Sequence, residues 1–213
     1  MAPPQNDAFP VALNLQGRSV LVLGGGVEAV QKVPRLIDAG AHVTLVAPEV
    51  DASLARAARA RALVWFARTF SPSDLHGVQV VMLTEPSAEL AATLRALSRR
   101  HPFWLCAIDQ PDYADFFMVS TLVCGPVQIA ISTSGRAPLL ARHLRRALAQ
   151  GLGPRFGEFA RSFAALRARL RPLPKGQRTE LLERALDGFA MEVRVRYPER
   201  DGQGTDYPPE PAR

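Results

Sequence analysis

The chain alternates short apolar runs with segments whose apolar residues recur at helical spacing. The first run, residues 19–23 (SVLVL), is uncharged and rich in β-branched residues, which is typical of a strand buried on both faces of a parallel sheet. Residues 27–39 then carry apolar side chains on one helical face, and residues 42–46 (HVTLV) read as a second buried strand. This order predicts a strand–helix–strand unit.

The same alternation continues to residue 108. It predicts helices over residues 52–62 and 87–98, and strands over residues 63–66, 78–83 and 104–108. Strands that alternate with helices form parallel sheets covered on both faces. The expected fold is therefore α/β, with a Rossmann-like doubly wound parallel sheet.

The pattern changes after residue 109. Residues 116–123 and 127–132 are two β-rich stretches with a Gly-Pro pair between them, which predicts a hairpin, and helices are expected over residues 139–149, 156–170 and 177–193. The segment GLGP at 151–154 is expected to break the helical pattern. We therefore expect a nucleotide-binding domain over 9–115, a small α+β segment over 116–150 and a helical domain over 151–197, with disordered ends at 1–8 and 198–213.

Composition narrows the class of protein. A hydrophobic share of 47% and a charged share of 22% are ordinary for a globular chain, and no apolar run approaches the roughly 20 residues that span a membrane. The N-terminus lacks the basic and apolar stretches of a secretory signal. Cys106 and Cys124 form no CxxC pair, which favours free thiols in a reducing compartment. We expect a cytoplasmic protein without a membrane segment, a disulfide framework or a metal site.

The net charge of +6 is unevenly distributed. Residues 142–196 hold 13 Lys and Arg against 5 Asp and Glu, a net of +8, so the rest of the chain sums to −2. The arginines stand singly among apolar residues at helical spacing, which is typical of a solvated helix face but also suits an anionic ligand.

The segment that follows the first strand, GGGVEA, fits the dinucleotide fingerprint G-x-G-x-x-A. Gly24 would permit the tight turn, Gly26 would let the backbone approach a pyrophosphate, and Ala29 would let the helix pack close to the sheet. Glu49 is a late candidate for the acidic residue that binds ribose hydroxyls, although it could equally be a charge at a helix N-terminus. No arginine stands there to bind a 2′-phosphate, which favours NAD over NADP.

Asp109 ends the fifth apolar run, at the sheet edge where open α/β folds bind ligands. It could act as a general base, or it could merely cap the turn that follows.

A loop rich in hydroxyl groups leads into the helix expected from residue 139, and the N-terminus of a helix attracts anions. The candidate groups for binding an anionic substrate there are Ser132, Thr133, Ser134, Arg136 and His143. Ordinary capping by Ser134 ahead of Pro138 is the structural alternative, and a lone histidine such as His143 is more often a surface residue.

These motifs, taken in order, resemble the siroheme synthase family, the bifunctional precorrin-2 dehydrogenases and sirohydrochlorin ferrochelatases. The resemblance rests on LQGR and VLVLGGG, then AGA and VTLVAPE, then AID and DFFM, and finally GPVQIAISTSGRAPLLARHLR, between Phe9 and about Ala149. Two positions depart from the family pattern, since Cys106 stands in place of the usual Asn and Val119 in place of the usual Pro. The larger family members also carry a methyltransferase domain, for which this chain is too short.

The resemblance implies an NAD-dependent oxidation of the tetrapyrrole precorrin-2 to sirohydrochlorin, with ferrous iron insertion as a second activity in some members, and a homodimer. Asp109 matches the family's essential aspartate, and Thr133 matches a position that is a phosphorylatable serine in some members. The implied cofactor contacts are Gly26, Val27, Glu28, Pro48, Glu49, Thr84 and Glu85. The rival hypothesis is an NAD-sensing regulator whose arginine-rich helices bind nucleic acid, but those helices show no recognition-helix pattern and few aromatics for stacking.

Overall fold

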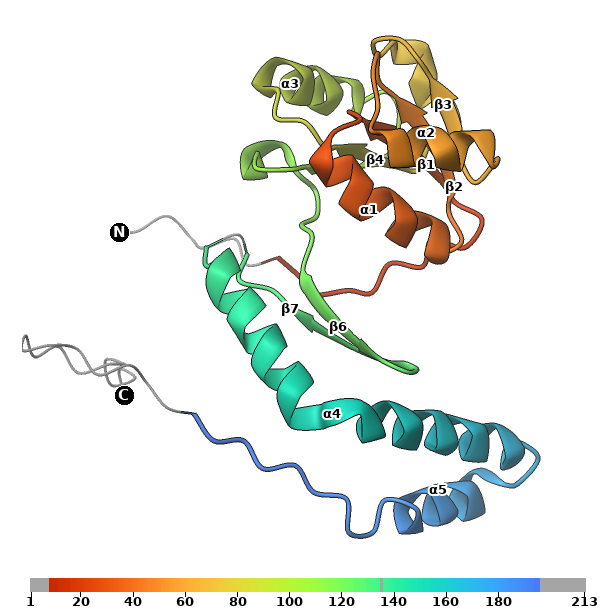
Figure 1. Cartoon of the computed structure of the whole chain (residues 1–213). Helices are drawn as coiled ribbons and strands as arrows, with labels where there is room; N and C mark the ends of the chain where they lie inside the picture. Colours follow the sequence, from red (N-terminus) through yellow and green to blue (C-terminus); the bar gives the residue numbers. More distant parts are fainter. Residues whose placement is uncertain (1–7, 135, 196–213) are drawn as a thin grey trace, which may run out of the picture.

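The computed structural model describes residues 8–134 and 136–195, which form a sheet domain followed by a hairpin and a long helix (Figure 1). Apart from Ala8, the ends that were expected to be disordered lie outside the described residues.

Five parallel strands form the sheet, in the order β3-β2-β1-β4-β5. The strands are β1 (Ser19–Leu23), β2 (His42–Val46), β3 (Val64–Phe66), β4 (Val80–Leu83) and β5 (Trp104–Ala107). The winding direction reverses between β1 and β4, which is the switch point at which such sheets bind ligands. The predicted doubly wound parallel sheet is confirmed.

Helices cover both faces of the sheet because alternate strand residues point to opposite sides. Helices α1 (Val27–Asp38) and α2 (Ala52–Arg59) pack over Val20 and Val22. Helix α3 (Ala88–Leu97) and the 3-10 turn η1 (Pro72–Leu75) pack over Leu21 and Leu23. Both faces of the central strand are therefore buried, which explains why its sequence is apolar throughout.

After β5 the chain passes through the 3-10 turn η2 (Pro111–Tyr113) to an antiparallel hairpin, β6 (Ser120–Cys124) and β7 (Val127–Ile131). Helix α4 (Pro138–Arg169) packs on this hairpin and is followed by α5 (Lys175–Arg184) (Figure 1). At the hairpin turn Gly125 has φ +60°, and a Cβ there would lie 2.8 Å from the carbonyl oxygen of Gly157 in α4. The turn and the helix thus approach each other at two glycines.

Three predicted features differ most from the structure. The first hairpin strand begins at Ser120 rather than at residue 116, because the apolar residues before it pack on the sheet domain and line a cavity. The predicted break at 151–154 is confined to Gly153, whose φ of 62° and ψ of 179° kink α4. Helix α5 ends at Arg184 rather than at residue 193, and Gly188 beyond it has φ +76°.

Among residues 8–134 and 136–195, no helix combines the length and the apolar character that a membrane-spanning segment needs.

Candidate functional site

Three of the predicted site segments lie at one edge of the sheet. Leu23, Leu83 and Ala107 are register partners at the carboxyl ends of β1, β4 and β5. The glycine turn at 24–26, the pair Thr84 and Glu85, and the loop that carries Asp109 follow these three ends directly. The sheet therefore brings together the cofactor and catalytic candidates that the sequence predicted separately.

The turn at residues 24–26, called the glycine corner below, needs glycine for two different reasons. Gly24 has φ +107°, a conformation that side chains rarely adopt. Gly25 has an ordinary φ, but a Cβ there would lie 2.3 Å from the carbonyl oxygen of Glu49. The Thr84 hydroxyl, which is almost fully buried, donates a 2.9 Å hydrogen bond to the Leu23 carbonyl and so holds the corner in place.

The corner already holds an anion, which is the carboxylate of Glu85. Its Oε1 atom accepts hydrogen bonds from the backbone N–H groups of Gly25 (2.9 Å) and Gly26 (3.2 Å). These amides stand at the N-terminus of α1, where the helix dipole favours negative charge. An oxygen of a dinucleotide pyrophosphate would make the same bonds, so the residues present fit such a group.

The other cofactor candidates surround this corner. Val27 begins α1 with a 74% exposed side chain, and Glu28 forms an ion pair with Lys32 at 3.3 Å. Pro48 and Glu49 follow β2 and are exposed. Their side chains can all be reached from solvent, as contacts to an incoming ligand require.

Asp109 lies on a loop that is tied back to its own strand. The Asp115 carboxylate accepts a 2.9 Å bond from the Leu105 N–H and pairs with Arg95, while the Asp115 N–H donates to the Leu105 carbonyl at 2.7 Å. Asp109 has φ +60° and an exposed side chain. This conformation is uncommon for a non-glycine residue, although aspartate adopts it more readily than most, and it occurs often at functional positions.

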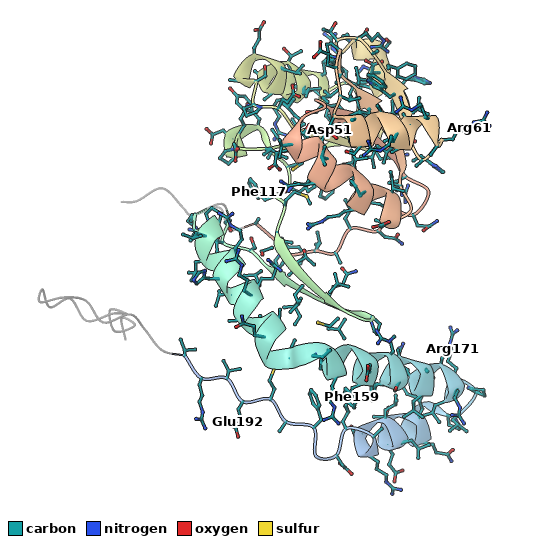
Figure 2. The ribbon with its side chains drawn as sticks, viewed as in Figure 1. Asp51, Arg61, Phe117, Phe159, Arg171 and Glu192 are labelled. Carbon is teal, nitrogen blue, oxygen red and sulfur yellow. The ribbon has the colours of Figure 1, made fainter. Side chains whose placement is uncertain are left out.

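A cavity of about 470 Å³ lies where the sheet domain meets the hairpin and α4. Four of its lining residues are cations, and none of its lining residues is acidic; we call it the basic cavity. The cations are Lys32 and Arg35 on α1, and Arg142 and Arg145 on α4. Phe117, labelled in Figure 2 where the chain leaves the sheet domain, is part of the apolar wall.

The cations of the basic cavity are largely uncompensated. Lys32 pairs with Glu28, but in the described part of the chain no carboxylate pairs with Arg35, Arg142 or Arg145. Four hydroxyl groups stand among them, on Ser120, Thr121, Ser132 and Thr133. A ligand with several carboxylates matches this combination of charge and hydrogen-bonding groups.

Only two of the five predicted substrate contacts line the basic cavity. Ser132 and Thr133 line the basic cavity, whereas Ser134, Arg136 and His143 are not among its lining residues. His143 is exposed, and the α4 residues that line the cavity lie on a different face of the helix.

Capping by Ser134 was a wrong expectation. The residue at the cap position of α4 is Ala137, and its N–H donates to the Thr133 hydroxyl at 3.2 Å. Pro138 does begin the helix, as expected.

The four cations of the basic cavity were not among the residues predicted for the site. Lys32 and Arg35 are three residues apart on α1, and Arg142 and Arg145 are three residues apart on α4, so each pair shares a helix face. This spacing was visible in the sequence, but nothing in the pattern showed that the two faces meet.

The two departures from the family pattern lie in different surroundings. Val119 lines the basic cavity. Cys106 is buried in the core between β5 and α1, and its burial raises the pKa of the thiol to about 11 despite the nearby charge of Lys32. A change at Val119 therefore alters the cavity wall directly, whereas a change at Cys106 acts through the core.

Two further features concern metal binding and a second cavity. Among the described residues, no three His, Cys, Asp or Glu side chains are grouped so that they could hold a metal ion. A mostly apolar cavity of about 760 Å³ lies between α4 and residues 189–195. Phe159 of α4, labelled in Figure 2, stacks there on Phe189 with 5.2 Å between the ring centroids.

Comparison with known proteins adds two family models and a set of relatives. A model described as putative NAD(P)-binding matches residues 11–120, and a model described as the central part of a sirohaem biosynthesis protein matches residues 125–150. The first match covers the sheet domain and the second covers β7 and the first turns of α4.

Siroheme synthases are similar to this chain over most of its length. The protein from Methylococcus capsulatus is 34% identical over 190 residues, covering 88% of this chain and 40% of the relative. Siroheme synthase 3 of Aeromonas hydrophila is 34% identical over 182 residues, covering 84% and 39% respectively. The chain thus spans about 40% of the length of these curated relatives.

A solved structure named "SirC, precorrin-2 dehydrogenase" shares the fold with a TM-score of 0.71. It is 23% identical, and the match covers 84% of this chain and 90% of that one.

Proposed function

Because the chain belongs to the siroheme synthase family, we propose that it oxidises precorrin-2 to sirohydrochlorin with NAD as the oxidant. The observation that carries this proposal is that the glycine corner and the basic cavity both border α1. Gln31, the first α1 residue of the cavity wall, follows Gly26 by five residues, or about 8 Å along the helix. A cofactor held at the corner and a polycarboxylate held in the cavity would be near neighbours.

The dinucleotide would be held at the glycine corner. The Gly25 and Gly26 N–H groups would bind its phosphates, and Val27, Glu28, Pro48, Glu49 and Thr84 would surround the remainder. Bound there, the nicotinamide supplies a hydride acceptor. NAD is preferred to NADP because the residues after β2 are Ala47, Pro48 and Glu49, which offer no cation to a 2′-phosphate.

The basic cavity would hold the carboxylates of the tetrapyrrole. Its three arginines can form paired hydrogen bonds with carboxylates, and its hydroxyl groups can donate further bonds. Phe117 and Met118 offer an apolar surface to the macrocycle. Arg142 and Arg145 also belong to the most basic part of the sequence, which suits a polyanionic substrate.

Asp109 would take up a proton during the oxidation. The substrate loses one hydride, which carries two electrons to the nicotinamide, and one proton. A carboxylate at this sheet edge would accept that proton. The bonds that Asp115 makes to β5 fix the loop, so that Asp109 need not be ordered by the substrate.

The test is NADH formation from precorrin-2, followed by NADH absorbance. We expect Asp109→Asn to lower kcat at least about a hundredfold, since general-base catalysis contributes that much, and to leave NADH binding unchanged. Asp112→Asn, an exposed aspartate of the same loop, is the matched control and should retain the activity. An unimpaired Asp109→Asn enzyme would remove Asp109 from the mechanism.

The basic cavity is tested separately. Arg142→Ala and Arg145→Ala should each raise the KM for precorrin-2 about tenfold or more, as the loss of a charge-assisted hydrogen bond implies, without changing the KM for NAD. Arg146→Ala, on the same helix but outside the cavity wall, is the control. An equal effect of all three variants would argue against the cavity as the substrate site.

Ferrous iron insertion into sirohydrochlorin is a second reaction of this proposal, with iron as substrate. Because the described residues offer no metal-binding group of three, the macrocycle nitrogens would hold the iron and Asp109 would accept a proton that the iron displaces. Cobalt uptake by sirohydrochlorin without NAD measures this step. Asp109→Asn should slow it, and an unchanged rate would separate the two reactions.

We further propose that the protein is a homodimer, with residues 116–150 as the dimerisation segment between the domains at 9–115 and 151–197. Exposed apolar side chains on Leu139, Leu140 and Val123 support this arrangement. Sedimentation of the wild type and of Leu140→Lys tests it, since a dimer through this surface should dissociate. The free thiols of Cys106 and Cys124 favour the cytoplasm as its compartment.

A further inference from the structure

The carboxylate of Glu85 occupies the atoms that the dinucleotide must use. Its Oε1 accepts from both the Gly25 and the Gly26 N–H, and these are the two amides that the glycine corner presents at the start of α1. One carboxylate oxygen shared by two amides is the arrangement by which backbone groups bind a phosphate oxygen.

We propose that Glu85 is an internal competitor for the glycine corner, and that the cofactor phosphates bind only after displacing its carboxylate. This inference rests on the proposed function for the identity of the ligand. A ligand that requires the open corner binds with its intrinsic affinity multiplied by the fraction of molecules in which the corner is open. Glu85 thereby sets the cofactor affinity, although it is not itself a partner of the phosphates.

The surroundings of Glu85 make both positions of its side chain accessible. The residue is exposed, so its carboxylate can leave the corner for solvent without crossing packed atoms. The backbone on which it stands is fixed, because the preceding residue Thr84 is buried and bonded to the carbonyls of Leu23 and Gly24. The side chain can therefore move while the corner keeps its shape.

Occupation of the corner also has an electrostatic reason. The Gly26 N–H, at the N-cap of α1, has no partner within the helix, and both it and the preceding Gly25 N–H would otherwise depend on water. A carboxylate satisfies both, and the helix dipole adds to the attraction. The same two effects attract a phosphate, so the two anions exclude each other at one place.

The decisive variant is Glu85→Asp, which retains the charge but shortens the side chain by one methylene group. An aspartate at this position holds its carboxylate away from the two amides. If competition at the amides matters, NADH should bind Glu85→Asp and Glu85→Ala about tenfold more tightly than the wild type, measured by titration calorimetry. If mere charge repulsion matters, only Glu85→Ala should bind more tightly.

A second measurement needs no ligand. In ¹⁵N-labelled protein, the amide resonances of Gly25 and Gly26 should shift, and their hydrogen exchange should accelerate, in Glu85→Ala and Glu85→Asp. Glu89→Gln, an exposed glutamate in the first turn of α3, is the control and should leave both resonances unchanged.

The outcomes separate this inference from the proposed function. Unchanged Gly25 and Gly26 resonances in the Glu85 variants, or weaker NADH binding by Glu85→Ala, would overturn the proposal that Glu85 competes with the cofactor. If the resonances shift but no variant binds NADH, the contact between Glu85 and the two amides is supported. The dinucleotide would then not be the ligand that competes with Glu85, and the proposed function would fail.

Discussion

Replacing Gly25 by alanine tests whether the glycine corner is specified by steric contact. A Cβ at this position would lie 2.3 Å from the Glu49 carbonyl oxygen and 2.8 Å from the Val50 Cα atom, both of them backbone atoms. To reach the shortest tolerable separation of 3.0 Å, the Glu49 carbonyl would have to move by about 0.7 Å. That movement is opposed by the hydrogen bond from the Asp51 N–H to the Gly25 carbonyl, at 3.0 Å.

The expected loss follows from these contacts. Overpacking of this kind costs about 1–3 kcal/mol, and a weakened hydrogen bond adds about 1 kcal/mol. The lower entropy of the unfolded alanine chain offsets about 0.5 kcal/mol. We expect Gly25→Ala to lower the free energy of unfolding by about 1.5–3.5 kcal/mol, which urea titration followed by circular dichroism would measure.

The neighbouring glycine provides the control. A Cβ at Gly26 would meet only the Glu85 carboxylate, at 3.5 Å, and its backbone has φ −84°, which alanine adopts freely. Gly26→Ala should therefore cost no more than about 1 kcal/mol, the usual range for a cap substitution. If Gly25→Ala proved as stable as Gly26→Ala, the steric argument for the corner would be wrong.

Three other predictions concern the fold around the site. Alkylation of the native protein near pH 8 should modify Cys124 and spare Cys106, because burial raises the pKa of the Cys106 thiol to about 11; peptide mass mapping would reveal any early labelling of Cys106. Asp74→Asn should lower the free energy of unfolding by about 1 kcal/mol at pH 7, because Arg68 lowers the pKa of the Asp74 carboxyl. The difference from the wild type should begin to shrink only near about pH 4 and should be lost as the pH falls further, through the lowered pKa of the folded state. A difference that did not depend on pH in this acid range would contradict the charge effect. Asp115→Ala should lower the free energy of unfolding by about 2 kcal/mol, because it removes the bonds to Leu105 and Arg95. It should also lower kcat while leaving the KM for NAD almost unchanged. Equal changes in kcat and in the KM for NAD would instead point to a general loss of structure.

The sheet and its ligand edge could be predicted from the sequence because they depend on local patterns. A strand buried on both faces must be apolar throughout, and a tight turn from strand to helix needs glycine. The run SVLVL followed by GGG was therefore sufficient to predict the central strand and the turn that follows it. Asp109 was proposed for the same reason, since it follows a recognisable apolar strand, whereas Thr84 and Glu85 were named only because the family resemblance implies them.

The basic cavity could not be predicted because its walls are distant in the sequence. Lys32 and Arg145 stand on helices that meet only in the folded chain. The apolar residues at 116–119 were misread as part of a strand because an apolar run has the same composition whether it pairs with a strand or crosses between two domains. The contact between Glu85 and the corner depends on one side-chain rotamer, for which no sequence pattern exists.

The contact between Gly125 and Gly157 helps to set the direction of α4 without using its charged surface residues as the buried partners. The outer half of α4 leans on the hairpin turn through main-chain atoms, and its buried positions are Gly157 and Ala160. Small residues thus occupy the buried positions of this half of the helix, and the exposed Arg161 lies beside the contact with the turn. Apart from Arg161, the charged exterior could therefore change by mutation, and so adapt the protein to new surroundings, without reorienting the helix that carries it.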